Sequence, residues 1–248
     1  MKNIVEKYFE AIDRNDYDYI EKELENNLDI NIKDKEGYTG FHKAIFGENI
    51  EMCKFLIQKG IVIDDLSCHY AAALGKKEIV QIIIEQGIDV NARDSVGWTA
   101  LHWACQEGHI DIVKLLLRNN AEISIQEEDG QTPLYIAAAE GKYEVVKSLL
   151  IAGAQVDLPS FFGTTPFKVA CAFENYKEAK LLLEYNANID FKDREGRTPL
   201  FYAKIKKRKK MIRFLIENGA DTSVIDNYGI SISDLDEESI REKIVKEV

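Results

Sequence analysis

The chain has 248 residues, of which 46% are hydrophobic and 30% are charged, and its formal net charge at pH 7 is −11. This composition is sufficient to bury a hydrophobic core, and the length suits one large or two small domains. The acidic balance argues against general nucleic-acid binding, because phosphate contacts need clustered Lys and Arg. No apolar run is long enough to cross a membrane, and residues 1–13 lack the apolar core of a secretory signal.

A repeat with a strict spacing of 33 residues runs through the chain. Its marker glycines are Gly97, Gly130, Gly163, Gly196 and Gly229, and Thr or Ser stands two residues after each of them. An apolar segment with an alanine then follows in four of these repeats, and Gly37, Thr39 and Ala44 match the same template upstream. Fixed-period self-similarity of this kind indicates a repeated supersecondary unit.

Each repeat predicts two short helices joined by a turn. Thr followed by Pro is a helix start, because the Thr hydroxyl accepts a bond from a free backbone N–H and Pro fits the first helical position. The second helix carries an apolar stripe, as at Ile112, Val113 and Leu116. The residue expected to end it in the left-handed conformation is always Gly or Asn: Asn27, Gly60, Gly87, Asn120, Gly153, Asn186 and Gly219.

These motifs resemble the ankyrin-repeat family over nearly the whole chain. The family pattern Gly-x-Thr-Pro-Leu-His-x-Ala is visible at residues 97–104 as Gly-Trp-Thr-Ala-Leu-His-Trp-Ala. The resemblance implies an all-α solenoid of helix-turn-helix units with projecting β-hairpin fingers. It also implies binding of other proteins through a concave face formed by the fingers and the first helices.

In chain order, we expect one elongated domain over residues 1–248, beginning with a capping repeat at 1–33. Six units follow, at 34–65, 66–93, 94–126, 127–159, 160–192 and 193–225. Residues 226–248 begin a last unit that loses the pattern and ends in a predicted polar closing helix with Ile240, Ile244 and Val245.

One unit is short. His42 and His69 are 27 residues apart, whereas His69 and His102 are 33 apart, so six residues are missing between Gly60 and Leu66. One interpretation is a tolerated deletion in a surface loop. The other is a notch in the concave face that admits part of a partner.

The variable contact positions of the family map onto finger tips and first-helix ends. As partner-binding residues we predict Tyr38, Phe46, Trp98, Gln106, Glu107, Phe161, Phe162, Phe173 and Arg197. The aromatic members are expected to face one side, with a hot spot in residues 95–175, because exposed aromatic groups are typical of binding surfaces. Phe161 and Phe162 fall at a finger tip, where a neighbouring finger or a partner should cover them. Trp98 has the alternative of packing on the next finger.

A basic run follows the last predicted first helix: Lys204, Lys206, Lys207, Arg208, Lys209 and Lys210. Residues 193–225 contain nine Lys or Arg and four Asp or Glu, a balance of +5. The run is interpreted as a solvated turn, or as a nuclear-import signal or docking patch for an anionic partner. The acidic residues Asp234, Asp236, Glu237 and Glu238 are an alternative partner within the chain.

No catalytic residue, metal site or cofactor is expected. Every histidine and cysteine has a structural position in the repeat: His42, His69, His102 and His109, and Cys53, Cys68, Cys105 and Cys171. Their spacing matches no zinc site, and no phosphate-binding loop is present. Glu127, Glu128 and Asp129 are interpreted as solvated charges at a finger tip.

The sequence therefore predicts a non-catalytic interaction module or adaptor for another protein, monomeric alone and cytoplasmic, with nuclear access if the basic run is an import signal. The alternative is a regulatory subunit or inhibitor that docks on an enzyme and modulates its activity. Neither membrane nor direct nucleic-acid contact is expected.

Overall fold

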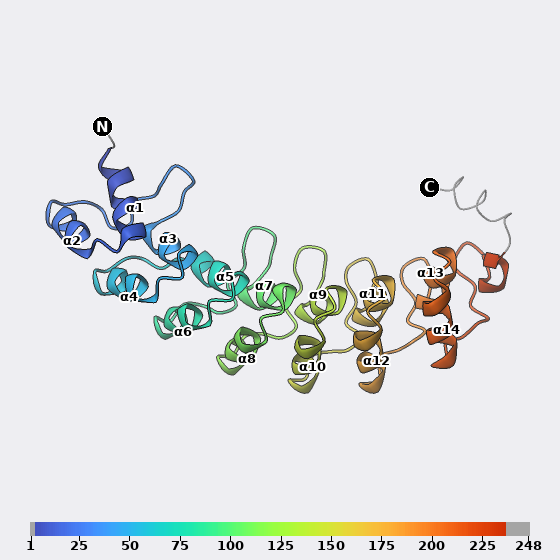
Figure 1. Cartoon of the computed structure of the whole chain (residues 1–248). Helices are drawn as coiled ribbons and strands as arrows, with labels where there is room; N and C mark the ends of the chain where they lie inside the picture. Colours follow the sequence, from blue (N-terminus) through green and yellow to red (C-terminus); the bar gives the residue numbers. More distant parts are fainter. Residues whose placement is uncertain (1–2, 237–248) are drawn as a thin grey trace. The chain divides into compact units, whose positions relative to one another are not determined.

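The computed structural model describes residues 3–236, and in this part of the chain the helices α1–α14 form consecutive pairs (Figure 1). The chain separates into two compact parts, Met1–Glu122 and Ile123–Val248. We call them the N-terminal block and the C-terminal block and describe each by itself. Treatment of residues 1–248 as a single domain stays a prediction.

The N-terminal block contains four helix pairs. They are α1 (Ile4–Arg14) with α2 (Tyr17–Glu25), α3 (Gly40–Phe46) with α4 (Ile50–Gln58), α5 (Asp65–Ala73) with α6 (Lys77–Glu85), and α7 (Ala100–Glu107) with α8 (Ile110–Arg118). The first helices pack in the order α1, α3, α5, α7, and the second helices α4, α6 and α8 form a second layer. The core between them is apolar, with Phe41, Ile45, Leu56, Ile83 and Leu116 fully buried.

In residues 123–236, the described part of the C-terminal block, three helix pairs are followed by a turn of 3₁₀ helix. The pairs are α9 (Pro133–Ala139) with α10 (Tyr143–Ile151), α11 (Pro166–Ala172) with α12 (Tyr176–Glu184), and α13 (Pro199–Ile205) with α14 (Lys209–Glu217). The 3₁₀ helix η1 (Ile232–Asp236) packs on α13. The predicted closing helix with Ile240, Ile244 and Val245 lies outside the described residues.

The predicted helix starts and ends are confirmed. Thr132 caps α9 by accepting a bond of 3.1 Å from the backbone N–H of Tyr135, and Pro133 occupies the first turn. All seven Gly or Asn positions after the second helices have a left-handed backbone, with φ from +63° at Asn186 to +91° at Gly153. This conformation lets the N–H groups that follow bond back to the last helical carbonyls, which ends the helix cleanly.

The connecting loops differ from the predicted β-hairpin fingers. In residues 3–236 there is no β-strand, and the β-type pairing consists of one isolated bridge between Ile225 and Ser231. Each full-length loop is instead closed by a tight turn, as where the N–H of Gly130 donates to the carbonyl of Glu127 over 2.9 Å. The marker glycines have positive φ in these turns, so the repeat's glycine sets the turn rather than a strand pair.

None of the helices in residues 3–236 has the length and apolar character that a membrane crossing requires.

Candidate functional site

Three phenylalanines of one repeat are exposed in the C-terminal block. Phe161 and Phe162 lie at the tip of the loop before α11 and are 50% and 60% exposed. Phe173, the residue directly after α11, is 64% exposed. The sequence prediction that these loop-tip rings lie outside the core of their own repeat is confirmed.

Phe161 rests on the preceding loop. Its N–H donates to the carbonyl of Asp129 over 2.9 Å. A Cβ added to Gly130, whose φ is +79°, would lie 2.5 Å from the Phe161 nitrogen and 2.6 Å from its ring. Glycine at this position therefore permits the close approach, and the neighbouring loop covers one side of Phe161.

The aromatic residues predicted as contacts in the N-terminal block pack largely on one another. Phe46 is 38% exposed, and its ring lies edge-on to Tyr38 at 5.0 Å and to Tyr70 at 5.5 Å. Tyr38 and Trp98 are half-buried, and Trp98 packs on Trp103 with ring centroids 4.7 Å apart. The sequence analysis missed Tyr70 because it took contact residues from finger tips and first-helix ends, whereas Tyr70 lies inside α5.

At the end of α7, Gln106 is half-buried and Glu107 is exposed. That the aromatic contact residues of both blocks face one side, with a hot spot over residues 95–175, stays a prediction.

The shortened connection between α4 and α5 lacks the tight loop-tip turn of the full-length loops, and residues 61–64 lead directly from the end of α4 into α5. In the full-length repeat that follows, His69 Nε2 lies 3.1 Å from the carbonyl oxygens of Ala92 and Trp98 in the next loop. His42 has no such loop ahead of it, and its Nε2 lies 3.1 Å from Oδ1 of Asp64 instead. Asp64 also caps α5 by accepting the N–H of Ser67 over 3.0 Å. One carboxylate therefore replaces the backbone of the missing loop.

The cluster of His42, Asp64 and Ser67 has the residue types of a hydrolase triad but not its geometry. Nδ1 of His42 accepts the N–H of Thr39 over 3.1 Å, so the ring proton is on Nε2 and points at Asp64. In a catalytic triad the histidine nitrogen that faces the serine carries no proton, because it must accept one from the serine hydroxyl. Here Nε2 is protonated and cannot act as that base. The Ser67 hydroxyl donates to Asp64 over 2.8 Å instead, and Ser67 is fully buried. The arrangement is structural.

The helix position that holds His42, His69 and His102 in earlier repeats holds Lys168 in the repeat at 160–192, and this lysine forms a buried ion pair. Lys168 is 5% exposed, and its ammonium group bonds Oδ2 of Asp193 and the carbonyl of Arg197. Tyr202 donates to the same carboxylate over 2.9 Å. Burial lowers the pKa of Lys168, and the bond to Asp193 opposes that shift. The sequence analysis missed this pair, although a Lys at a helix position that holds His, Tyr or Phe in the other repeats is a visible signal.

Two charged side chains are held by contacts within the chain. Arg197 is 16% exposed, and its Nε donates to the fully buried carboxylate of Asp226 over 2.9 Å; partner contact at Arg197 stays a prediction. Glu127 was interpreted as a solvated charge, but it is 6% exposed and accepts the N–H groups of Asp129 and Gln131 at 3.0 and 2.9 Å. Glu127 stabilises its loop, because buried backbone N–H groups need an acceptor. Arg197 contributes differently, as the donor that pairs with the buried carboxylate of Asp226 in the next loop. Glu128 and Asp129 are exposed as expected.

The basic run lies at the end of α13 and the start of α14. Lys206, Lys207, Lys209 and Lys210 are exposed, and Lys204 is half-buried. Arg208 differs from the rest, because its guanidinium donates to the carbonyl of Ala172 at the end of α11. Asn175 makes the equivalent bond to Ala139 in the preceding repeat over 2.8 Å. Arg208 is therefore engaged in holding neighbouring repeats together.

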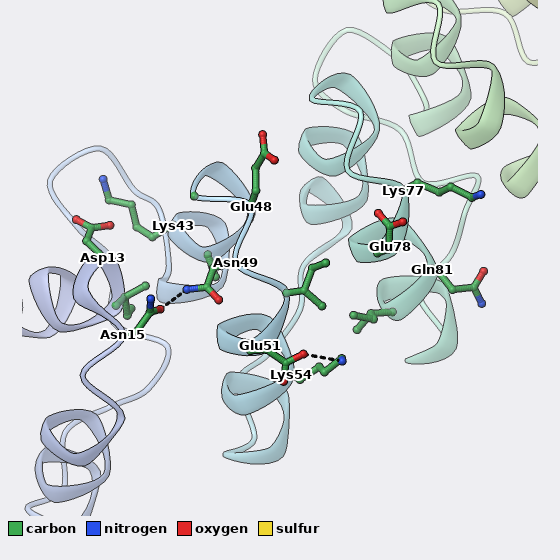
Figure 2. A pocket seen from close by; sticks show the side chains of 15 residues that line it. Asp13, Asn15, Lys43, Glu48, Asn49, Glu51, Lys54, Lys77, Glu78 and Gln81 are labelled. Atoms are coloured by element: carbon green, nitrogen blue, oxygen red, sulfur yellow. Dashed lines mark hydrogen bonds and ion pairs between the residues drawn. The ribbon is translucent and has the colours of Figure 1, made fainter.

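A groove of about 870 Å³ lies on the N-terminal block between residues of α1, α3, α4 and α6 (Figure 2). Its labelled lining carries charges of both signs, and Figure 2 shows two bonds that join lining residues to one another. These are the bond between Asn49 and Asn15, and the ion pair between Lys54 and Glu51 at 2.9 Å. The groove has no uniform charge and no exposed aromatic ring to recognise a ligand.

The cysteines are core thiols. Burial raises the pKa of Cys53 and of Cys68 to about 12, and it raises the pKa of Cys105 and Cys171 as well. A thiol with a raised pKa is a poor nucleophile and metal ligand at neutral pH. Within residues 3–236, no three His, Cys, Asp or Glu side chains gather in a way that could hold a metal ion.

Consecutive helix pairs with a repeating cap and turn define an all-α repeat protein of the solenoid type. A family model described as ankyrin repeats (3 copies) matches residues 9–94, 68–160 and 150–226. The chain belongs to the ankyrin-repeat family, whose repeats are in general non-catalytic protein-interaction modules.

Two relatives match shorter stretches. Over 94 residues, 37% of this chain and 23% of the relative, the chain is 29% identical to FPV034 of Fowlpox virus (strain NVSL), which is named as an ankyrin repeat protein. Over 78 residues, 30% of this chain and 3% of the relative, it is 39% identical to the E3 ubiquitin-protein ligase hecd-1 of Caenorhabditis elegans. The matches thus span less than a quarter of either relative.

Proposed function

We propose that this chain is a non-catalytic adaptor that binds a partner protein through the loop tips and first-helix ends of its repeats. The observation that carries the proposal is the exposure of Phe161, Phe162 and Phe173, each at least half exposed. Full burial of an exposed Phe side chain is worth roughly 1.5–3 kcal/mol, and each of these rings forgoes about half of that or more. Exposed aromatic groups that gather in one repeat are characteristic of interaction sites.

The loop that carries Phe161 and Phe162 is held in place before any partner binds. The N–H of Ser160 donates to the carbonyl of Thr164 over 2.9 Å, and the carbonyl of Pro159 accepts from Gln126 over 2.9 Å. Together with the bond between Phe161 and Asp129, these contacts fix the loop against its neighbour. A preorganised loop loses less conformational entropy on association, which favours affinity.

The test uses the double variant Phe161→Ser with Phe162→Ser. The partner is first captured on the immobilised chain and identified, and its affinity is then measured by calorimetry. We expect the double variant to lower affinity by on the order of 2 kcal/mol or more. Thermal unfolding should change little, because both rings are at least half exposed in the free protein and lie outside the core. Assaying any activity of the captured partner with and without the chain separates a plain adaptor from a regulatory subunit or inhibitor.

The matched control is Ile151→Ser, which removes an apolar side chain that is 67% exposed on α10, a second helix. It should leave affinity unchanged. If the double variant instead loses several degrees of melting temperature and binds its partner normally, the two rings are internal packing and the proposal is wrong.

A further inference from the structure

We propose that the C-terminal block selects a partner segment with ordered charges, basic at one end, apolar in the middle and acidic at the other end. The inference rests on the proposed function, because it specifies the partner of that same surface. It follows from the side chains that three neighbouring repeats, 127–159, 160–192 and 193–225, place at their loop tips and first-helix ends.

The order of the three repeats is fixed by contacts within the block. The first helices pack in the order α9, α11, α13. The loop of the middle repeat bonds the loop before it through Phe161 and Asp129, and Gly163 lies against the loop after it, where an added Cβ would be 3.0 Å from the nitrogen of Arg194. The loop tips and helix ends of the three repeats therefore stand next to one another in sequence order.

Each repeat presents a different chemistry at these positions. The first has exposed carboxylates at Glu128, Asp129 and Glu140, and we call this the acidic column. The second has the exposed rings of Phe161, Phe162 and Phe173, the aromatic column. The third has the exposed cations Arg194, Lys206 and Lys207, the basic column.

Two further carboxylates lie in or beside the last two columns. Glu195 is half-buried in the loop of the basic column, where its charge acts on the buried Lys168. Glu174 is exposed in the turn directly after Phe173. Neither changes the order of the columns, because the basic column keeps three exposed cations against the half-buried Glu195.

The spacing of the columns sets the length of the partner segment. Packed helices lie about 8–10 Å apart, so the acidic and basic columns are separated by about 20 Å. About six residues of extended chain or about 13 residues of helix span that distance. The separation exceeds the Debye length of about 8 Å at physiological salt. Each end of the segment therefore interacts with its own column, and the two opposite charges of the surface do not cancel.

A protein segment matches this surface better than a nucleic acid does. Phosphates would be attracted to the basic column, but the same strand would meet Glu128, Asp129 and Glu140 two repeats away. A uniformly charged polymer cannot complement both ends, whereas a polypeptide can place Lys or Arg, a large apolar side chain and Asp or Glu in sequence.

The experiment compares two fluorescent peptides of identical composition and about 14 residues, long enough to span the columns in either conformation. The block peptide carries Lys at one end, Trp and Leu in the centre and Asp at the other end. The interleaved peptide has the same centre, with Lys and Asp alternating on both sides. Anisotropy titrations with the full chain should show the block peptide bound about ten-fold more tightly, with an advantage that shrinks in high salt.

Charge-reversal variants locate the effect. Glu128→Lys with Glu140→Lys should abolish the advantage of the block peptide. Glu144→Lys with Glu184→Lys is the matched control, because it changes net charge equally on exposed positions of the second helices α10 and α12. The control variant should retain the advantage. Phe162→Ser with Phe173→Ser should weaken both peptides.

Four outcomes would overturn the inference, and they separate it from the proposed function. If both peptides bind equally and the Phe variant weakens both, ordered charge selection is wrong while the interaction surface stands. Ordered charge selection is equally wrong if the Glu128 and Glu140 variant and the Glu144 and Glu184 control lose the same affinity for the block peptide. It is also wrong if a single-stranded oligonucleotide, which is negatively charged along its whole length, binds as tightly as the block peptide. If neither peptide binds, the inference is wrong, and the proposed function is decided by the captured partner and the Phe161 and Phe162 variants alone.

Discussion

Asp64 shows how a single side chain replaces a missing structural element. Where the following loop has full length, the equivalent histidine, His69, hydrogen-bonds the backbone carbonyls of that loop. His42 faces a connection that is six residues shorter, and the carboxylate of Asp64 stands where those carbonyls would be. Burial alone would raise the pKa of Asp64, but hydrogen bonds from His42 and Ser67 lower it to about 2.

The lowered pKa predicts a dependence of stability on pH. Because the folded-state value lies below the ordinary value of about 3.9, the ionised carboxylate stabilises the fold above that value, and its contribution is lost as pH falls toward 2. Asp64→Asn should lower the free energy of unfolding at neutral pH by about 1 kcal/mol, a discounted figure because the side chain is 40% exposed. Urea unfolding over a pH series should show the difference from the natural chain vanishing between about pH 4 and pH 2.

Asp65→Asn is the control, since it removes the same charge from the first turn of the same helix, where Asp65 is exposed. A difference between Asp64→Asn and the natural chain that persists at the lowest pH would mean that the ionised carboxylate is not what stabilises the connection.

At the scale of elements, the short connection leaves the first two helix pairs with fewer ties to the rest of their block. What joins them across the gap includes the bond between His42 and Asp64, a bond of 2.8 Å from the N–H of Val62 to Asn31, and the ion pair of Lys76 with Glu48. Repeat stability is roughly a sum of unit and interface contributions. An interface without a full loop therefore contributes less.

We expect residues 1–60 to open before the central repeats. Amide hydrogen exchange followed by mass spectrometry should find lower protection in α2 and α4 than in α8 and α10. These four are second helices of equal length, so their protection can be compared directly. Asn31→Ala removes the acceptor for Val62 and should widen the difference. Equal protection in all four helices of the natural chain would contradict the expectation.

At the scale of the whole molecule, charge is distributed unevenly. Residues 193–225 carry +5 in a chain of −11, so the remainder carries −16. Four of the six residues of the basic run are exposed lysines, while Arg208 bonds the end of α11. The acidic residues Glu237 and Glu238, considered as an alternative partner for the run, lie outside the described residues.

Replacing Lys206, Lys207, Lys209 and Lys210 with Gln should weaken binding of an anionic partner and flatten its salt dependence, because four exposed cations are removed. If the run is an import signal, a fluorescent fusion should also lose nuclear accumulation. Arg208→Gln is the control: it should reduce thermal stability by freeing the carbonyls of α11, with the salt dependence kept. Unchanged affinity and unchanged localisation in the fourfold variant would leave the run as a solvated turn.

The sequence predicted what depends on local chemistry. Thr132 and Pro133 start a helix, and Asn120 ends one, for reasons that lie within a few residues, and the structure confirms these assignments. Exposure of Phe161 and Phe162 followed from their place in the repeat. The burial of Arg197 was not predictable in the same way, because its partner Asp226 stands 29 residues away in the next repeat. The partner of Lys168, Asp193, is likewise distant, 25 residues along the chain, although the lysine itself stands out in the repeat.

The pair of Lys168 and Asp193 also limits how such an array can grow by duplication. A tandem copy of residues 160–192 would place the first copy's Lys168 opposite Ser160 of the second, in the slot that Asp193 now occupies 33 residues later. A hydroxyl cannot neutralise a buried ammonium group, so that junction would carry an uncompensated charge. A copy of residues 193–225 would instead set Phe201 before Asp193, with no cation to satisfy. The repeats share one backbone conformation, yet the residue at the position of Lys168 must match the residue it contacts in the next loop. Gene duplication can therefore lengthen this protein at some junctions and not at others.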